Sequence, residues 1–253
     1  MAKNIYRESF TVRTYETRPD GFAKMPSICN YLQEAASNHA KQLNWNFNAK
    51  ADSNKIWVLQ RLTVKMDTYP RWTDTVTVET WPQSGDTIRA FRDFRITSES
   101  GEVLGKAISQ WMILNKETHK PTHIPEEILT LSNPEDSHIF PFPEKRIPNF
   151  TDCEKTAKLN VDFIDLDLNK HANNVTYIKW LLASIPNDIL ITNRPSKIDI
   201  EYKGECNAGD TLESRFKSAD YTPNNHCVVY EHQINKLPTN RPLASARITL
   251  THV

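Results

Sequence analysis

Side chains that can exchange protons or form hydrogen bonds alternate along a short stretch in the second half of the chain. They are Asp165, Asp167, Asn169 and His171. Apolar residues at helical spacing follow directly, at Val175, Ile178, Leu182 and Ile185. We therefore expect an extended segment that passes into a helix within a few residues. Because a helix N-terminus presents free backbone N–H groups and a partial positive charge, it can hold a substrate oxygen that becomes negative.

Two asparagines stand where this helix should begin. Asn173 or Asn174 is most simply the N-cap residue, and the N–H groups around them are candidates for an oxyanion hole. Asp165 is interpreted as a structural group. The polar positions from 167 to 171 are two apart, so an extended backbone would place them on one face. A histidine before a helix, taken alone, is more often structural than catalytic, and both interpretations stay open on spacing alone.

Length, charge and cysteine content narrow the possible classes. The chain has 253 residues, and 31 Lys and Arg balance 31 Asp and Glu. It can bury a core without disulfides, and its zero net charge gives no global indication of a nucleic-acid partner. The cysteines are far apart and include no CxxC pair, which predicts reduced thiols rather than a zinc site. They are Cys29, Cys153, Cys206 and Cys227.

No targeting signal or membrane-spanning segment is recognised in the sequence. No apolar run is long enough to span a bilayer, no signal core is present near the start, and Glu8 argues against a transit peptide. No nucleotide-binding loop or cluster of metal ligands is visible, so we expect no cofactor and no metal. These observations predict a cytoplasmic protein.

The order of predicted elements repeats in the two halves. The first half shows a strand, a turn and a helix (10–17, 27–41), then strands at 57–66, 74–81, 88–97 and 103–115. The second half shows a strand (159–163) and the helix after 173, then strands at 197–203, 210–217, 227–235 and 243–251. Antiparallel strands after a helix can wrap around it, so the repeat predicts a pseudo-dimer of two α+β units. Chance similarity of two α+β halves is the alternative.

Prolines mark the boundary between the halves. They are concentrated between positions 121 and 149, where they remove ladder donors and stiffen the chain. We predict an N-terminal unit at 1–120, an ordered Pro-rich linker at 121–150 with a short helix near 126–131, and a C-terminal unit at 151–253.

The stretch Asp-Leu-Asp-Leu-Asn-Lys-His-Ala-Asn-Asn-Val-Thr-Tyr-Ile-Lys-Trp closely resembles a signature of the acyl-acyl-carrier-protein (acyl-ACP) thioesterases, the plant plastid enzymes and their bacterial relatives. Glu201–Cys206 resembles the second signature of that family, and Trp57–Leu62 and Leu32–Ala35 resemble its N-terminal landmarks. The resemblance covers nearly the whole chain. It implies a double hotdog fold, in which two tandem α+β units each wrap an antiparallel sheet around a long helix. The absence of a transit peptide favours a bacterial-type enzyme.

The resemblance implies a catalytic set in the C-terminal half, made of Asp167, Asn169, His171 and Glu205. Glu205 would activate water, His171 would orient that water or protonate the departing thiolate, and Asn169 would bind the carbonyl or the water. Asp167 would orient the asparagine. The plant pattern usually has Gln at Lys170 and Arg at Gly204, which puts the local electrostatics in question without removing a member of the set.

Cys206 is the rival nucleophile, because a Cys–His–Asn arrangement would form a covalent acyl-enzyme. Neighbouring residues on a strand point to opposite faces, so only one of Glu205 and Cys206 can face His171. We favour Glu205 with water.

The N-terminal half lacks an equivalent polar set, since its turn reads Arg-Pro-Asp-Gly-Phe from position 18. We predict that it holds the acyl chain in a tunnel, although for any one of these residues considered alone a core role is the better explanation. The candidates are Ile28, Leu32, Ala36, Val58, Val76, Phe91 and Trp111.

The implied partner, acyl carrier protein, is acidic, so a chain of zero net charge needs a local basic face to bind it. Dense cations on the predicted strands could form that face or could simply be solvated. They are Arg61, Lys65, Arg71, Arg89, Arg92 and Arg95. His39, on the first helix, has no clear partner and is interpreted as structural. A homodimer is also expected.

Other functions are compatible with the same fold. A coenzyme A thioesterase would use identical chemistry, and a dehydratase would use His with an acid on a hydroxyacyl thioester. A non-catalytic acyl-binding protein would not need the polar set. The Asn-x-His sequence and the Glu-Cys pair favour hydrolysis of fatty acyl-ACP, which ends chain elongation.

Overall fold

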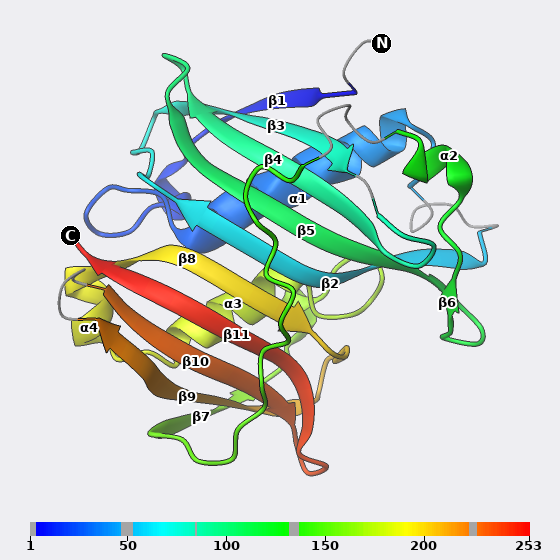
Figure 1. Cartoon of the computed structure of the whole chain (residues 1–253). Helices are drawn as coiled ribbons and strands as arrows, with labels where there is room; N and C mark the ends of the chain where they lie inside the picture. Colours follow the sequence, from blue (N-terminus) through cyan, green and yellow to red (C-terminus); the bar gives the residue numbers. More distant parts are fainter. Residues whose placement is uncertain (1–3, 47–52, 84, 132–136, 223–226) are drawn as a thin grey trace. The chain divides into compact units, whose positions relative to one another are not determined.

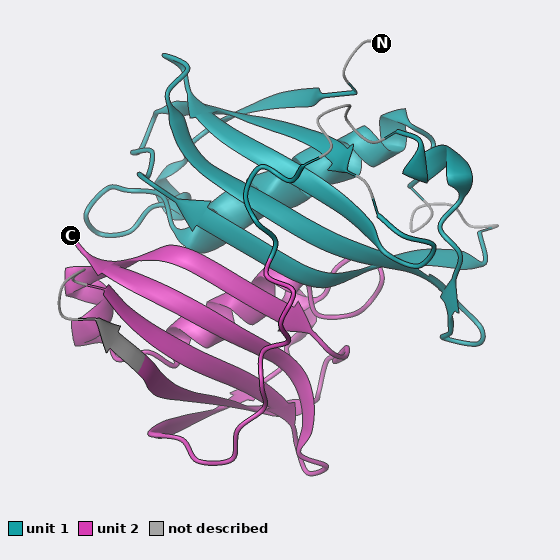
Figure 2. Ribbon diagram, viewed as in Figure 1, with its two compact units in different colours: residues 1–142 teal, residues 143–253 magenta. Residues whose placement is uncertain are grey.

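A computed structural model describes residues 4–46, 53–83, 85–131, 137–222 and 227–253. Phe47, which is expected from the sequence to pack back on the core from a polar loop, lies outside these ranges. The chain divides into two compact units, residues 1–142 and 143–253 (Figure 2). This division falls within the proline-rich stretch 121–150. No helix in the described ranges is both long and apolar enough to cross a membrane.

Unit 1 is an antiparallel sheet with one long helix, α1 (Met25–Gln42) (Figure 1). The strands lie in the spatial order β1-β3-β4-β5-β2, and the short β6 (Pro121–Thr122) pairs with β5. Their bounds are β1 Tyr6–Thr11, β2 Lys55–Met66, β3 Thr75–Gln83, β4 Ala90–Ser98 and β5 Val103–Asn115. A short helix, α2, spans Glu126–Leu129 near its predicted position.

Helix α1 forms the centre of unit 1. Pro26 lies in its first turn, where the fixed proline φ suits a helix start and no donor is lost. Residues at helical spacing, including Ile28, Leu32 and Ala35, are at most 2% exposed. The inward positions of β3, Val76 and Val78, are completely buried. The predicted alternation and periodicity therefore describe the core of this unit correctly.

Unit 2 repeats the arrangement with a shorter helix, α3 (Asn174–Ala183). Its strands lie in the order β8-β11-β10-β9-β7. Their bounds are β7 Lys155–Asn160, β8 Asn193–Tyr202, β9 Thr211–Thr222, β10 Cys227–Lys236 and β11 Arg241–His252. A further helix, α4 (Asn187–Thr192), was not expected from the pattern. Each unit is a hotdog of the α+β class, as predicted.

The first strand of each unit begins and ends earlier in the chain than predicted. A 3₁₀ turn follows it, η1 (Thr14–Glu16) in unit 1 and η3 (Phe163–Asp165) in unit 2. The carboxylate of Asp165 accepts the backbone N–H of Asp162 at 3.0 Å, which closes η3. Asp165 is thus a structural group, and the local side-chain bond overrides the alternating pattern.

The two helix starts are built alike. The N–H of Ser27 donates to the Lys24 carbonyl at 3.0 Å, and the N–H of Thr176 donates to the Asn173 carbonyl at 2.9 Å. By this correspondence, each residue in the first turn of α1 is equivalent to a residue in the first turn of α3. The repeat predicted from element order therefore extends to individual hydrogen bonds.

Candidate active site

The polar stretch before α3 forms a closed turn. The N–H of Asp167 donates to the His171 carbonyl at 2.8 Å, and the N–H of Lys170 donates to the Asp167 carbonyl at 3.0 Å. Lys170 has φ +64°, the left-handed region. The expectation of an extended segment with these polar residues on one face was wrong here, because the chain must reverse direction within this turn.

Asp167 and Asn169 are joined twice inside the turn. One carboxylate oxygen of Asp167 accepts the backbone N–H of Asn169 at 2.7 Å, and the other accepts its side-chain Nδ2 at 3.3 Å. This pairing fixes the orientation of the amide and leaves its Oδ1 directed away from the carboxylate. It is the geometry that a residue orienting Asn169 requires.

His171 meets Glu205 across two loops. The imidazole Nε2 lies 3.4 Å from a carboxylate oxygen of Glu205, and both side chains are partly exposed. The turn and the loop are linked by the N–H of Ala172, which donates to the Cys206 carbonyl at 3.0 Å. Nδ1 of His171 is buried and has no hydrogen-bond partner among the described residues. The pair therefore combines a proton-exchanging ring with a carboxylate that solvent can reach.

Asn173 is the N-cap of α3. Its Oδ1 accepts the N–H of Val175 at 2.8 Å, which confirms one of the two predicted positions for the cap. Asn174 is the first helical residue, and its carbonyl accepts the Tyr202 hydroxyl at 3.0 Å. The helix start therefore lies directly after the turn that carries His171. An oxyanion hole at this end stays a prediction.

Cys206 points into the core. It is completely buried, whereas the side chain of Glu205 is 49% exposed. Both lie in the loop after β8 and not on the strand from which opposite faces were predicted, yet their environments still differ. Burial raises the pKa of the Cys206 thiol to about 11, so it is protonated at neutral pH. These properties disfavour a thiolate nucleophile.

Tyr177 belongs to the quoted motif but is not among the predicted site residues. Its hydroxyl lies 3.2 Å from the Cys206 sulfur and 3.2 Å from the Gly204 carbonyl oxygen. An aromatic residue at a helical core position gives no local signal of such contacts.

Unit 1 contains the same turn with different side chains. The N–H of Arg18 donates to the Phe22 carbonyl at 2.7 Å, which matches the bond between Asp167 and His171. Gly21, with φ +82°, takes the left-handed position of Lys170. Phe22 therefore stands where His171 stands in unit 2, and the predicted lack of Asn and His in this turn removes the proton-exchanging group.

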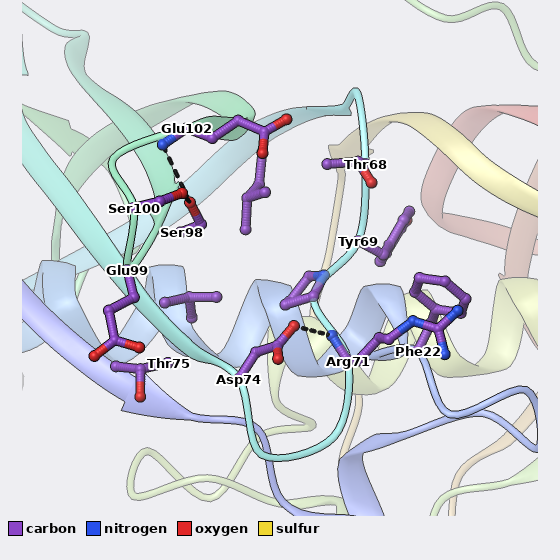
Figure 3. A pocket seen from close by; sticks show the side chains of 13 residues that line it. Phe22, Thr68, Tyr69, Arg71, Asp74, Thr75, Ser98, Glu99, Ser100 and Glu102 are labelled. Atoms are coloured by element: carbon purple, nitrogen blue, oxygen red, sulfur yellow. Dashed lines mark hydrogen bonds between the residues drawn. The ribbon is translucent and has the colours of Figure 1, made fainter.

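A hollow of about 710 Å³ adjoins this unit 1 turn (Figure 3). The backbone N–H of Arg71 donates to the carboxylate of Asp74 at 2.7 Å on its wall, and hydroxyl and acidic residues line much of the rest. Of the predicted acyl-chain residues, Val76 contributes to its lining. The full lining is Phe22, Thr68, Tyr69, Pro70, Arg71, Asp74, Thr75, Val76, Ser98, Glu99, Ser100, Glu102 and Leu104.

The other acyl-chain candidates divide into two groups. Ile28, Leu32 and Ala36 are buried in the core of unit 1 along α1. Val58, Phe91 and Trp111 are partly exposed on strands of the sheet. The ring of Phe91 makes an edge contact with Phe142 at 5.2 Å between centroids, and the Trp111 indole donates to Ser109 at 2.7 Å. The tunnel stays a prediction.

The cations proposed for a basic face are largely engaged within unit 1. Arg61 is 5% exposed, and Arg95 pairs with Glu79 at 3.0 Å. Arg92 donates to Nδ1 of His39 at 2.9 Å. The sequence left a basic docking face and solvated cations as the alternatives, and these three arginines are instead buried or paired within unit 1.

His39 has clear partners, which corrects the expectation that it has none. Besides Arg92, its Nε2 lies 3.3 Å from Asn4, and its ring stacks on Tyr6. Burial, and then the charge of Arg92, lower its pKa to about 4. A neutral histidine in this position is structural, as the sequence analysis proposed.

Comparisons with known proteins place both halves of the chain. Residues 3–131 match the acyl-ACP thioesterase N-terminal domain, and residues 150–249 match the C-terminal domain of the same family. The chain is 35% identical over 236 residues to oleoyl-acyl carrier protein thioesterase 2, chloroplastic, from Arabidopsis thaliana. That match covers 87% of this chain and 64% of the relative, so the chain spans about three-fifths of the length of such curated relatives.

Solved structures share the fold over nearly the whole chain. An acyl-ACP thioesterase from Bacteroides thetaiotaomicron superposes with a TM-score of 0.87 at 21% identity, covering 99% of this chain and 100% of that one. The 12:0-ACP thioesterase from Umbellularia californica gives 0.83 at 25% identity, covering 99% and 95%. Since the two family domains follow each other in one chain that also has the double hotdog fold of these structures, the protein belongs to the acyl-ACP thioesterase family.

Proposed function

We propose that the protein hydrolyses fatty acyl-ACP thioesters to free fatty acid and carrier, and so ends chain elongation. The observation that carries this proposal is the approach of His171 to Glu205, 3.4 Å apart at the N-terminal end of α3. Family membership supports the substrate class, and the curated relatives are named as acyl-carrier-protein thioesterases. Unit 2 would carry the chemistry, and unit 1 would hold the acyl chain.

The chemistry needs a base, an anion-stabilising group and an acid. Glu205 takes a proton from water, whose oxygen attacks the thioester carbonyl carbon while the carbonyl π electrons move to oxygen. Asn169 and the N–H of Asn174 are the candidates to stabilise that oxyanion, because the N–H groups of Asn173, Val175 and Thr176 already donate to Asp165 and Asn173. The intermediate then collapses, the C–S bond breaks, and the departing thiolate receives a proton through His171.

The contacts of Asn169 and the burial of Cys206 support this division of roles. Asp167 binds both the backbone N–H and the side-chain Nδ2 of Asn169, so the amide is already oriented before the reaction. No conformational entropy is then lost to orient it during the reaction. The buried thiol of Cys206 supports water rather than cysteine as the nucleophile, because the protonated thiol is a poor one. The net reaction consumes one water and gives an acid and a thiol.

The first test measures free-thiol release from a panel of acyl-ACP and acyl-coenzyme A thioesters. We expect wild type to hydrolyse the ACP thioesters faster, and His171→Ala to lose activity by about 10²–10⁴-fold. His252→Ala, an exposed histidine of the same unit, is the matched control and should keep full activity.

Three outcomes would change the proposal. Faster turnover of coenzyme A thioesters would mean that the carrier is coenzyme A and not ACP. Enoyl formation from hydroxyacyl thioesters would point to a dehydratase, and no turnover by folded protein would leave an acyl-binding protein. A cytoplasmic location and a homodimer also belong to the proposal, and fractionation and light scattering test them.

A further inference from the structure

The hydroxyl of Tyr177 contacts the loop that carries Glu205. Tyr177 lies in the first turn of α3 and is 2% exposed. Its hydroxyl contacts the carbonyl of Gly204 and the sulfur of Cys206, each at 3.2 Å. These contacts lie on either side of Glu205 in the sequence, so one phenol group restrains the loop immediately before and after the carboxylate.

The hydrogen-bond chemistry has one consistent arrangement. A carbonyl can only accept, so the single Tyr177 proton goes to Gly204. The Cys206 thiol then donates to the phenol oxygen. Burial raises the pKa of both side chains, that of Cys206 to about 11, so both are protonated at neutral pH. All three groups are therefore satisfied while neutral, and the thiol has a role as a donor.

Unit 1 shows what the same junction looks like without a catalytic set. The N–H that follows the turn binds the Cys206 carbonyl in unit 2 at 3.0 Å and the Pro70 carbonyl in unit 1 at 2.9 Å. In the helix, Ile28 stands at the position of Tyr177. Ile28 is completely buried, so apolar side chains suffice to pack this junction. The hydroxyl–thiol pair is therefore found in the unit that also carries the Glu205 carboxylate and the His171 imidazole.

We propose that Tyr177 and Cys206 are positioning residues that hold the Glu205 carboxylate within reach of His171. The inference rests on the proposed function for its kinetic consequence and on geometry alone for its structural one. Removing the hydroxyl removes one restraint on each side of Glu205, although the backbone bonds from Gly204 to Leu243 and from Ala172 to Cys206 remain. The carboxylate then spends less time near the imidazole, because a half-exposed side chain has solvent to move into.

The kinetic test is Tyr177→Phe, which removes one oxygen atom and keeps the ring. We expect kcat to fall by about tenfold to hundredfold with KM unchanged, because substrate binding does not use the phenol. Tyr31→Phe is the matched control. Tyr31 is 3% exposed, and its hydroxyl also makes a buried bond, to Glu16 at 2.6 Å in unit 1. We expect Tyr31→Phe to have a lower melting temperature than wild type and an unchanged kcat.

The thiol is tested by two replacements. Cys206→Ser keeps a donor and should retain most of kcat. Cys206→Ala leaves the phenol oxygen without its donor, and its kcat should fall several-fold.

Equal kcat values for wild type, Tyr177→Phe and Tyr31→Phe would overturn the role of Tyr177. Wild-type kcat in Cys206→Ala would overturn that of the thiol, and abolished kcat in Cys206→Ser with a trapped acyl adduct in wild type would assign the thiol to catalysis.

A measurement without substrate separates this inference from the proposed function. The ring-nitrogen ¹⁵N shifts of His171, assigned with His171→Ala, report whether a carboxylate lies beside the imidazole. Glu205→Gln gives the reference without it. Tyr177→Phe should move the shifts toward that reference, and Tyr31→Phe should not. Wild-type shifts in Tyr177→Phe would overturn the inference, even if no thioester were hydrolysed.

Discussion

His171 and Glu205 face each other across two loops, with 3.4 Å between Nε2 and the carboxylate. One loop is the turn before α3, and the other follows β8. The backbone bond from Ala172 to the Cys206 carbonyl joins them at 3.0 Å. Proton transfer requires a contact of about 2.6–3.2 Å or one bridging water, and catalytic hydrogen bonds in substrate-free enzymes are often longer than that.

The carboxylate of Glu205 gives the first prediction. Glu205→Gln keeps the size of the side chain but removes the base, so kcat for thioester hydrolysis should fall by about 10²–10⁴-fold while KM changes little. Steady-state kinetics check this. Glu144→Gln, at an exposed glutamate of the same unit, is the control and should match wild type. Full activity in Glu205→Gln would remove the carboxylate from the mechanism.

The buried cysteines give a second prediction, on thiol reactivity. Burial raises the pKa of Cys206 to about 11 and that of Cys29 to about 12, and both are at most 1% exposed. At pH 7–8 a thiol reagent should therefore modify the partly exposed Cys153 and Cys227, and it should reach the other two after unfolding. Mass spectrometry of the labelled protein checks the sites. Native labelling of Cys206 in step with lost activity would contradict a neutral, buried thiol.

The repeated turn gives a third prediction, on stability. Gly21 and Lys170 take corresponding left-handed conformations, with φ +82° and +64°. Gly21→Ala should lower the free energy of unfolding by about 1 kcal/mol, since a Cβ is strained at this φ. Lys170→Gly should raise it by about 0.5 kcal/mol, as strain relief exceeds the added chain entropy. Urea unfolding measures both, and equal effects of the same sign would exclude a strained turn.

His39 gives a fourth prediction, on pH. Its pKa is about 4 in the folded protein and 6.5 in its ordinary state, so between these values the unfolded chain binds the additional proton. Stability is therefore fully present above pH 6.5 and falls as pH drops toward 4, by about 1.4 kcal/mol per pH unit.

Replacement of this histidine tests the assignment. His39→Gln keeps an acceptor for Arg92 without a titrating ring, so the slope of stability against pH over this range should become shallower. His252→Gln, at an exposed site, should leave the slope unchanged. Urea unfolding from pH 4 to 7 gives the slopes, and identical slopes in all three proteins would contradict a neutral His39.

Much of the fold could be predicted from the sequence because its signals are local. Residues such as Ile28 and Leu32 recur at helical spacing, and Val76 and Val78 alternate, and these periods reflect which face of each element is buried. The repeat of strand, turn, helix and strands implied two similar units. The motif also led to Asp167, Asn169 and His171, whose local arrangement with Asn173 follows from residues close in the chain.

Other features depended on tertiary structure, because they join residues far apart in sequence or override a local pattern. The alternation from Asp165 to His171 favoured an extended segment, but side-chain and turn hydrogen bonds bend it. Arg61 looked like a surface cation and is buried, and His39 finds Arg92 only when α1 packs on the sheet. Nothing local in Tyr177 indicated its contacts with a distant loop.

The sequence by itself determined the element types, the two-unit repeat and the family signature, since these are written in periodicity and in one contiguous motif. Only the tertiary structure decided that Glu205 faces His171 while Cys206 turns inward. These two residues are adjacent in sequence, so their distance from the motif along the chain does not distinguish them. Their different orientations follow from how the loop after β8 packs on α3. Packing of that kind depends on contacts that no local pattern encodes.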